Sequence, residues 1–111
     1  MQEAKVYRNS EEIGLIQRDD VGMYHFQYSL DYVHHEEALS ISVHFPLQEE
    51  AFTSQMLFPF FFNLLAEGAI KEMQCRELKI DPDDHFTRLI QTTEFNTIGS
   101  ITLKETSHEM S

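Results

Sequence analysis

The feature that most limits how this chain can fold is an aromatic run, Phe58-Pro59-Phe60-Phe61-Phe62. So much apolar area in one short segment has to be covered, either by the rest of the protein or by a partner. The run lies within residues 56–65, where eight of ten residues are apolar. This stretch predicts a helix that is capped by Thr53 or Ser54 and keeps Pro59 in its first turn.

At 100° per residue, one side of that helix collects enough apolar side chains to form a core face. The expected core residues are Leu57, Phe60, Phe61, Leu64 and Leu65. Phe58 and Phe62 lie on the shoulder of this stripe, one turn apart. Two interpretations remain open: a central helix buried on several sides, or a helix whose shoulder binds a partner.

The first half of the chain has the alternation of β-strands, and the second half has helical patterns. Alternate residues of the segment 39–45, namely Leu39, Ile41, Val43 and Phe45, are expected in the core. The predicted strands cover residues 5–8, 13–18, 23–28, 39–45 and 99–104. The predicted helices cover turns within 31–38, then 56–65, 69–78 after a break at Gly68, and a segment from Asp81, as N-cap, to about Gln91.

This order of elements predicts an α+β fold, a small curved antiparallel sheet of about five strands packed with two to four helices. Residues 1–105 are expected to form a single domain, because one core is usual at a length of 111 residues. Residues 106–111 offer nothing to bury and are predicted to be a flexible tail.

The chain carries 8 Lys and Arg against 19 Asp and Glu, a net charge of −11. That charge argues against direct contact with nucleic acid or an anionic membrane surface and favours a basic protein partner. The polar N-terminus does not resemble a signal peptide, and the apolar run Met56–Phe62 is too short to span a membrane. We therefore expect a cytoplasmic protein.

The residue types that carry chemistry do not form a recognisable catalytic motif. His34-His35-Glu36-Glu37 contains four potential metal ligands, but adjacent side chains diverge on a helix and cannot converge on one ion. Cys75 is the only cysteine and is expected to be a small buried hydrophobe. We expect no cofactor, no metal and no enzymatic activity; a metal-dependent enzyme built on His34 and His35 is a formal alternative.

Several motifs, in this order and at these spacings, resemble the N-terminal subdomain of HipA-type serine/threonine kinase toxins. The resemblance covers about residues 5–103. Residues 60–68 are similar to the family segment F-F-x-N-L-L-P-E-G, and residues 81–86 to D-P-D-D-x-F. The other matching segments are Ile13-Gly14-Leu15-Ile16-Gln17-Arg18-Asp19, Gly22, Phe26-Gln27-Tyr28, Ile41-Ser42-Val43, Pro46-Leu47 and Ile98-Gly99-Ser100-Ile101.

As a free-standing copy of this subdomain, the chain looks like the HipS antitoxins of three-component HipBST toxin–antitoxin systems. The resemblance implies that it binds and neutralises a HipT-like kinase toxin, with a HipB-like DNA-binding protein as a possible third member of the complex. The alternative is a structural subunit that completes a split HipA-like kinase without inhibiting it. The residues expected to bind the kinase are Phe58, Phe62, Asn63, Leu65, Ala66, Glu67, Gly68, Ala69 and Ile70.

The chain departs from the family pattern within this segment. Ala66 replaces a proline, which makes the exit from the helix less rigid. Ala69 stands where many members carry a tryptophan, which argues against blocking of the kinase cleft by a bulky ring at this position. Phe62 occupies a position that is often polar, and this favours the interpretation of the helix shoulder as a contact surface.

Overall fold

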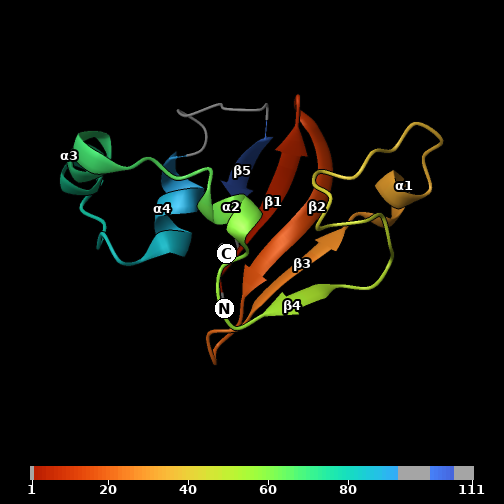
Figure 1. Ribbon diagram of the computed structural model, residues 1–111, viewed down its shortest axis with the longest axis horizontal. Helices are drawn as coiled ribbons and strands as arrows, with labels where there is room; N and C mark the ends of the chain where they lie inside the picture. Colours follow the sequence, from red (N-terminus) through yellow and green to blue (C-terminus); the bar gives the residue numbers. More distant parts are fainter. Residues whose placement is uncertain (1, 93–100, 107–111) are drawn as a thin grey trace.

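An antiparallel sheet forms the centre of the computed structural model, which describes residues 2–92 and 101–106 (Figure 1). Its five strands are arranged in the order β4-β3-β2-β1-β5, and every neighbouring pair is antiparallel. The predicted α+β fold is therefore confirmed. The elements are β1 (Gln2–Arg8), β2 (Glu11–Arg18), β3 (Tyr24–Tyr28), α1 (Leu30–Val33), β4 (Phe52–Ser54), α2 (Pro59–Phe62), α3 (Gly68–Leu78), α4 (His85–Thr92) and β5 (Ile101–Glu105).

Local sequence explains the two hairpins that begin the sheet. Asn9 and Ser10 both have positive φ angles, 50° and 73°, as a two-residue turn between twisted strands requires. In the second connection, the Asp19 carboxylate accepts the backbone N–H groups of Val21 and Met23 at 3.0 and 2.9 Å. The hydrogen bond with the His25 side chain, and then the one from Met23, hold the pKa of Asp19 below its ordinary value.

A β-bulge lets β2 bury the side chains of two residues, Ile13 and Ile16, that strict alternation would place on opposite faces of the sheet. The register of β1 and β2 shifts between Val6 and Tyr7, so that Ile13 becomes the extra residue of the pair. Both Ile13 and Ile16 are fully buried as a result. Gly14 lies between them because an added Cβ would come within 2.7 Å of the backbone oxygen of Gln27.

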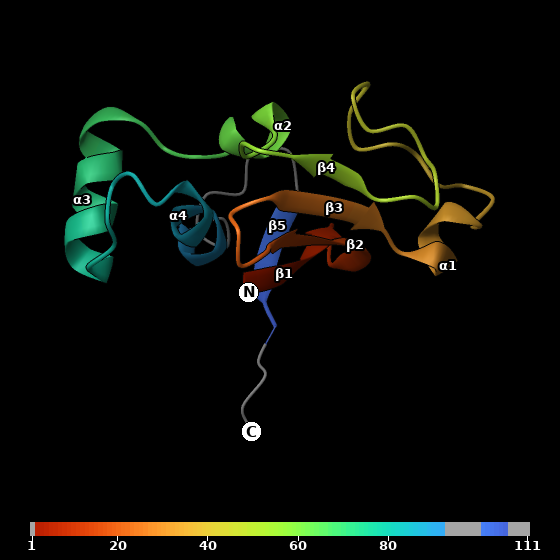
Figure 2. The same ribbon diagram turned by 90° about the horizontal axis from the view of Figure 1, so that it is seen from below.

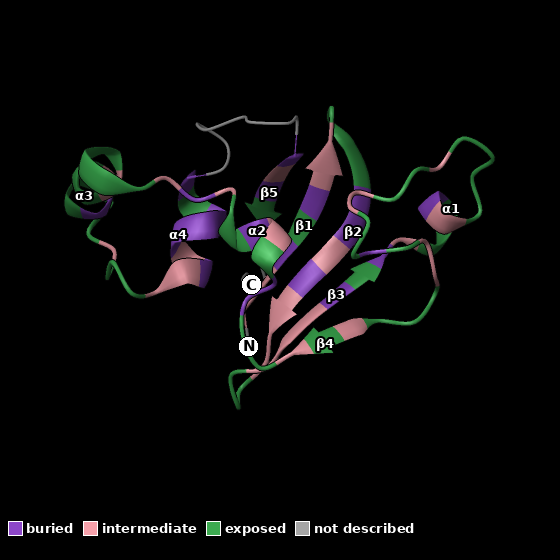
Figure 3. Cartoon of the chain, in the orientation of Figure 1, coloured by how far each residue is buried: buried purple, intermediate pink, exposed green. Residues whose placement is uncertain are grey.

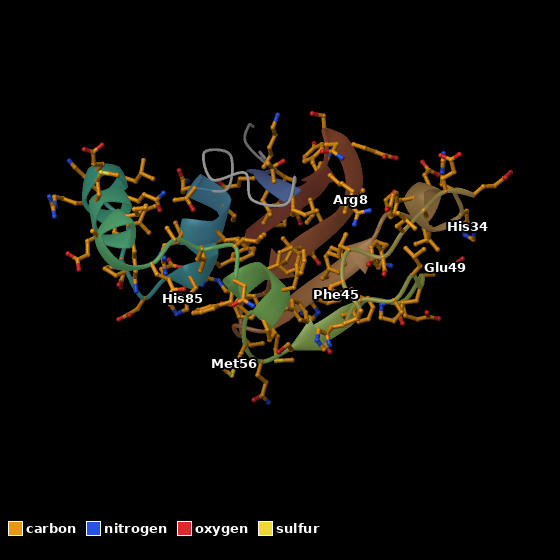
Figure 4. All side chains as sticks on the ribbon, turned by 45° about the horizontal axis from the view of Figure 1, so that its top comes forward. Arg8, His34, Phe45, Glu49, Met56 and His85 are labelled. Atoms are coloured by element: carbon orange, nitrogen blue, oxygen red, sulfur yellow. The ribbon has the colours of Figure 1, made fainter. Side chains whose placement is uncertain are left out.

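The helices and the long connection 34–51 lie mainly on one side of the sheet (Figures 1 and 2). α2 and the connection cover this face, α4 packs beside β5, and α3 lies farther out. Phe26 of β3 lies at the centre of the aromatic core, with its ring centroid 5.0 Å from Phe45 and 5.4 Å from Phe61. Phe45 lies between the sheet and α2 (Figure 4).

The predicted strand over residues 39–45 is wrong. These residues form turns and bends, and Leu39 and Val43 are 67% and 90% exposed instead of lying in the core. Only Phe45 is buried, with Ile41 half-buried. The place beside β3 is taken by β4, which the sequence did not predict.

Two tyrosine hydroxyls bind the backbone of this connection in place of a neighbouring strand. The Tyr28 hydroxyl donates to the carbonyl oxygen of Phe45 and accepts the N–H of Ile41 at 3.0 Å. The Tyr32 hydroxyl donates to the carbonyl of Leu39 at 2.6 Å and accepts its N–H at 3.1 Å. Side-chain hydrogen bonds therefore satisfy backbone groups that, in a β-strand, would form hydrogen bonds with the backbone of a neighbouring strand.

The helix expected over residues 56–65 is shorter than predicted. α2 begins at Pro59, the first helical position, and Phe58 occupies the N-cap position with an extended backbone. Pro59 thus lies in the first turn as expected, but Thr53 and Ser54 belong to β4 and are not caps. The chain continues to Leu65 as tight turns, in which the N–H groups of Leu64 and Leu65 donate to carbonyls three residues earlier.

The cap of α4 also differs from the prediction. Asp81 accepts the N–H of Asp83 at 2.9 Å in a turn that precedes the helix. Asp84, three residues later, accepts the backbone N–H of Thr87 at 3.2 Å and is the capping residue. The helix therefore begins at His85 and runs to Thr92.

The last predicted strand is confirmed within the described part of the chain. Ile101 and Leu103 of β5 are buried, and Gly99 and Ser100 lie outside the described residues. Thr106 donates its N–H to the carbonyl of Glu3 at 3.2 Å, so this first residue of the expected tail is bound to β1. Residues 107–111 lie outside the described residues.

Candidate partner-binding surface

The segment from α2 to the start of α3 presents most of the residues expected to bind a partner. Phe62 and Ile70 are 45% and 54% exposed. Phe58 and Leu65 lie in the core and support the segment from beneath. We call the accessible residues the α2–α3 surface: Phe62, Asn63, Ala66, Glu67, Gly68, Ala69 and Ile70.

Contacts with α4 hold this surface in place. The guanidinium of Arg88 donates to the carbonyl oxygen of Ala66 at 2.7 Å. The ring of Phe62 meets the ring of His85 edge to face, with centroids 5.0 Å apart. His85 lies on α4 on the side of the molecule that carries α2 (Figure 4). The α2–α3 surface is therefore fixed at both its aromatic residue and its backbone.

A pocket of about 210 Å³ opens within this surface. Its wall combines apolar side chains with two cationic ones, Lys71 and Arg88, and one carboxylate, Glu67. Arg88 is only 4% exposed, although it lines the pocket. The full set of lining residues is Phe62, Leu65, Ala66, Glu67, Gly68, Lys71 and Arg88.

The helix α3 extends the exposed apolar area beyond the pocket. It lies at the edge of the molecule, away from the sheet, and most of its surface is exposed (Figure 3). Ile70 and Met73, three residues apart, are 54% and 51% exposed and share one side of the helix. Cys75 is the one buried residue of α3, as predicted for a small hydrophobe.

An ion pair positions α4 against the sheet. Arg18 of β2 lies 3.3 Å from the Asp84 carboxylate, and its guanidinium carbon lies 5.5 Å from the centre of the Phe86 ring. Burial alone would raise the pKa of Asp84, but hydrogen bonds from Thr87 and the nearby charge of Arg18 lower it overall. The ionised carboxylate is therefore the form that the fold stabilises.

Asp84→Ala is expected to lower the free energy of unfolding at pH 7 by about 1 kcal/mol, since it removes the cap and the partner of Arg18. A carboxylate whose pKa is lowered by folding stabilises the protein above its ordinary pKa of about 3.9 and loses that effect as the pH falls through the folded-state value. Urea unfolding should therefore show the difference between parent and variant shrinking below about pH 4.

Asp84→Asn is the matched control, because asparagine also caps helices but carries no charge. It should retain most of the stability at pH 7 and show a weaker dependence on pH. A gap between the parent and Asp84→Ala that stays constant from pH 7 to pH 2 would contradict the assigned role of the ionised carboxylate.

The histidine pair singled out from the sequence does not build a metal centre. The side chain of His34 lies against that of Glu49, 2.7 Å between nitrogen and oxygen, at an exposed position at the far end of the molecule from α3 (Figure 4). His35 accepts the backbone N–H of Glu37 at 3.2 Å. Among residues 2–92 and 101–106, His, Cys, Asp and Glu do not gather in groups of three or more that could hold a metal ion.

Sequence reasoning missed the two cations of the pocket. Lys71 and Arg88 belong to different helices, and only the tertiary structure brings both to the same cavity. The neighbours of Arg88 in sequence, Leu89 and Ile90, indicate a core-facing helix, but they do not indicate that the guanidinium reaches Ala66.

The sheet order and the appended helices define an α+β domain that other proteins share. The chain belongs to the HipA N-terminal domain family, whose model matches residues 4–104. A solved structure described as the N-terminal domain of HipA toxin superposes with a TM-score of 0.74 at 30% identity, covering 98% of this chain and 96% of that one.

An uncharacterized protein of Haemophilus influenzae is 35% identical over 101 residues, which cover 91% of this chain and 90% of the relative. The HipA N-terminal domain is not the catalytic part of the kinase, so these matches give no positive indication of enzymatic activity. In the part of the chain that the structure describes, the helices are too short or too polar to cross a membrane.

Proposed function

We propose that this protein is a HipS-like antitoxin that binds and neutralises a HipT-like serine/threonine kinase toxin in a three-component system. The chain belongs to the family of the HipA N-terminal domain, a domain that HipA-type kinases carry. This membership supports the proposal that the partner is a HipA-type kinase. A HipB-like DNA-binding protein would complete the complex, and the net charge of −11 makes this chain itself unsuited to binding DNA. All three proteins would act in the cytoplasm.

The observation that carries this proposal is the exposed apolar area at the α2–α3 surface and on α3. Phe62, Ile70 and Met73 are each about half exposed, and such area on a small domain is typical of contact sites. It is rigidly presented, since Phe62 packs on His85 and Arg88 holds the carbonyl of Ala66. A preorganised surface loses little entropy when it binds.

The inhibitory contact is proposed to be a broad surface contact. Ala69 is exposed at the start of α3, and its methyl group is too short to fill a nucleotide cleft in the way a large ring would. Phe62 and Ile70, on either side of it, supply the larger apolar area. This protein would therefore neutralise the kinase by covering the part of the kinase surface against which Phe62 and Ile70 pack.

Co-expression with the HipT-like kinase of the same organism tests the proposal. An antitoxin restores growth that the kinase arrests, and the two proteins copurify. If the protein is a structural subunit that completes a split kinase, copurification occurs but growth arrest persists or deepens. Absence of copurification would exclude both roles. Glu36→Ala, far from the α2–α3 surface, is the matched control and should restore growth like the parent.

A further inference from the structure

We propose that the pocket within the α2–α3 surface binds an oxyanion, a carboxylate or phosphate group carried by a side chain of the partner protein. The identification of the partner protein as the carrier of this group rests on the proposed function. The binding of an oxyanion by the pocket itself does not depend on that function, because it follows from the residues that line the pocket.

The first observation is a buried positive charge whose hydrogen-bond partners are a backbone carbonyl and an imidazole nitrogen rather than a carboxylate. Arg88 is 4% exposed, and its guanidinium donates to the carbonyl of Ala66 at 2.7 Å and lies 3.3 Å from Nδ1 of His85. Among the described residues, its charge has no carboxylate within ion-pair distance. A guanidinium has five N–H groups, and buried charges are normally paired. Arg88 therefore retains N–H donors at the wall of a cavity, and within residues 2–92 and 101–106 it forms no ion pair, even with the Glu67 carboxylate that lines the same cavity.

The second observation is the start of α3 at the same cavity. Gly68 and Lys71 line the pocket, and the N-cap residue Glu67 makes no side-chain hydrogen bond to the first turn. In the described part of the chain, the backbone N–H groups of Gly68, Ala69 and Ile70, the first three of α3, donate no hydrogen bond. The N-terminus of a helix carries partial positive charge and favours anions. The Lys71 ammonium adds a second cation from the same turn.

The identity of the carrier follows from the overall charge. A chain with a net charge of −11 repels small free anions at long range. An anionic side chain on a protein whose surrounding surface is basic would instead be attracted to the acidic domain as a whole. The apolar rim of the pocket, Phe62 and Leu65, would then exclude water from the charged contact.

The pocket is tested on the isolated protein by NMR titration with inorganic phosphate and, separately, with acetate. We expect saturable shifts of the backbone amides of residues 68–71 and of the Arg88 side chain. Lys71→Gln should weaken phosphate binding about threefold or more, because it removes one charged donor. Arg76→Gln removes the same charge from an exposed position in the last turn of α3 and is the matched control.

Arg88→Gln is expected to abolish the shifts, and Lys71→Gln keeps the test decisive if the loss of the buried Arg88 impairs folding. Shifts that do not saturate, or that Lys71→Gln and Arg76→Gln weaken equally, would overturn the proposed site. A kinase whose affinity is unchanged by Lys71→Gln would overturn the partner as carrier. If the parent protein binds no kinase at all, the proposed function fails, while the titrations still decide whether the pocket binds an oxyanion.

Discussion

Phe61→Ala is expected to lower the free energy of unfolding by about 3–5 kcal/mol, enough to unfold a large fraction of a marginally stable domain. The Phe61 side chain is fully buried where α2 meets the sheet. Its ring lies 5.4 Å from Phe26, 5.9 Å from Phe45 and 5.2 Å from Phe60, so truncation leaves a cavity among rigid rings. Urea denaturation followed by circular dichroism measures the loss.

Phe62→Ala is the matched control for that experiment, since the two residues are adjacent in one helix and lose the same atoms. Phe62 is 45% exposed, and its truncation should cost about 1 kcal/mol or less. Equal losses at the two positions would mean that the inward and outward sides of α2 are wrongly assigned.

Phe62→Ala is also expected to weaken kinase binding by about 2 kcal/mol or more, roughly 30-fold in Kd, while the domain stays folded. An aromatic residue that is half exposed in the free protein and held by His85 is ready to bury the rest of its ring at an interface. Ile70→Ala, at the second exposed apolar residue of the α2–α3 surface, should also weaken binding. Titration calorimetry with the purified kinase measures both changes.

Val43→Ala provides the apolar control, because Val43 is 90% exposed and lies in the connection between α1 and β4. Glu36→Ala and Glu50→Ala provide the charge controls, since single exposed charges contribute little. All three should bind within about twofold of the parent. If Phe62→Ala binds like the parent, the contact lies elsewhere, and the edges of the sheet become the next surface to test.

Short-range patterns in the sequence predicted the sheet well where side chains alternate in and out. The strand predicted over residues 23–28 is present as β3, with Tyr24, Phe26 and Tyr28 on one face, and Asn9-Ser10 forms the turn between the first two strands. The final strand was also predictable, because Ile101 and Leu103 alternate with polar neighbours. In each case the residues that decide the structure are close together in the chain.

The errors arose where distant residues decide the structure. Residues 39–45 alternate as well as any strand in the chain, yet the hydroxyls of Tyr28 and Tyr32 bind their backbone outside the sheet. The pattern of residues 56–65 predicted a long helix, but it begins only at Pro59, after an extended Phe58. In the candidate site, the aromatic residues were visible in the sequence, whereas the convergence of Lys71 and Arg88 depends on how α4 packs.

The pairing of β1 with β5 has a consequence for how the protein folds. Val6 pairs with Gly14 in the adjacent hairpin strand and with Leu103 from the other end of the domain. The first pairing closes a short loop, whereas the second closes nearly the whole domain and costs more chain entropy. During synthesis the hairpin can form early, but one edge of β1 stays open until residues 101–105 leave the ribosome. That open edge is the point at which a nascent chain is most exposed to pairing with another chain.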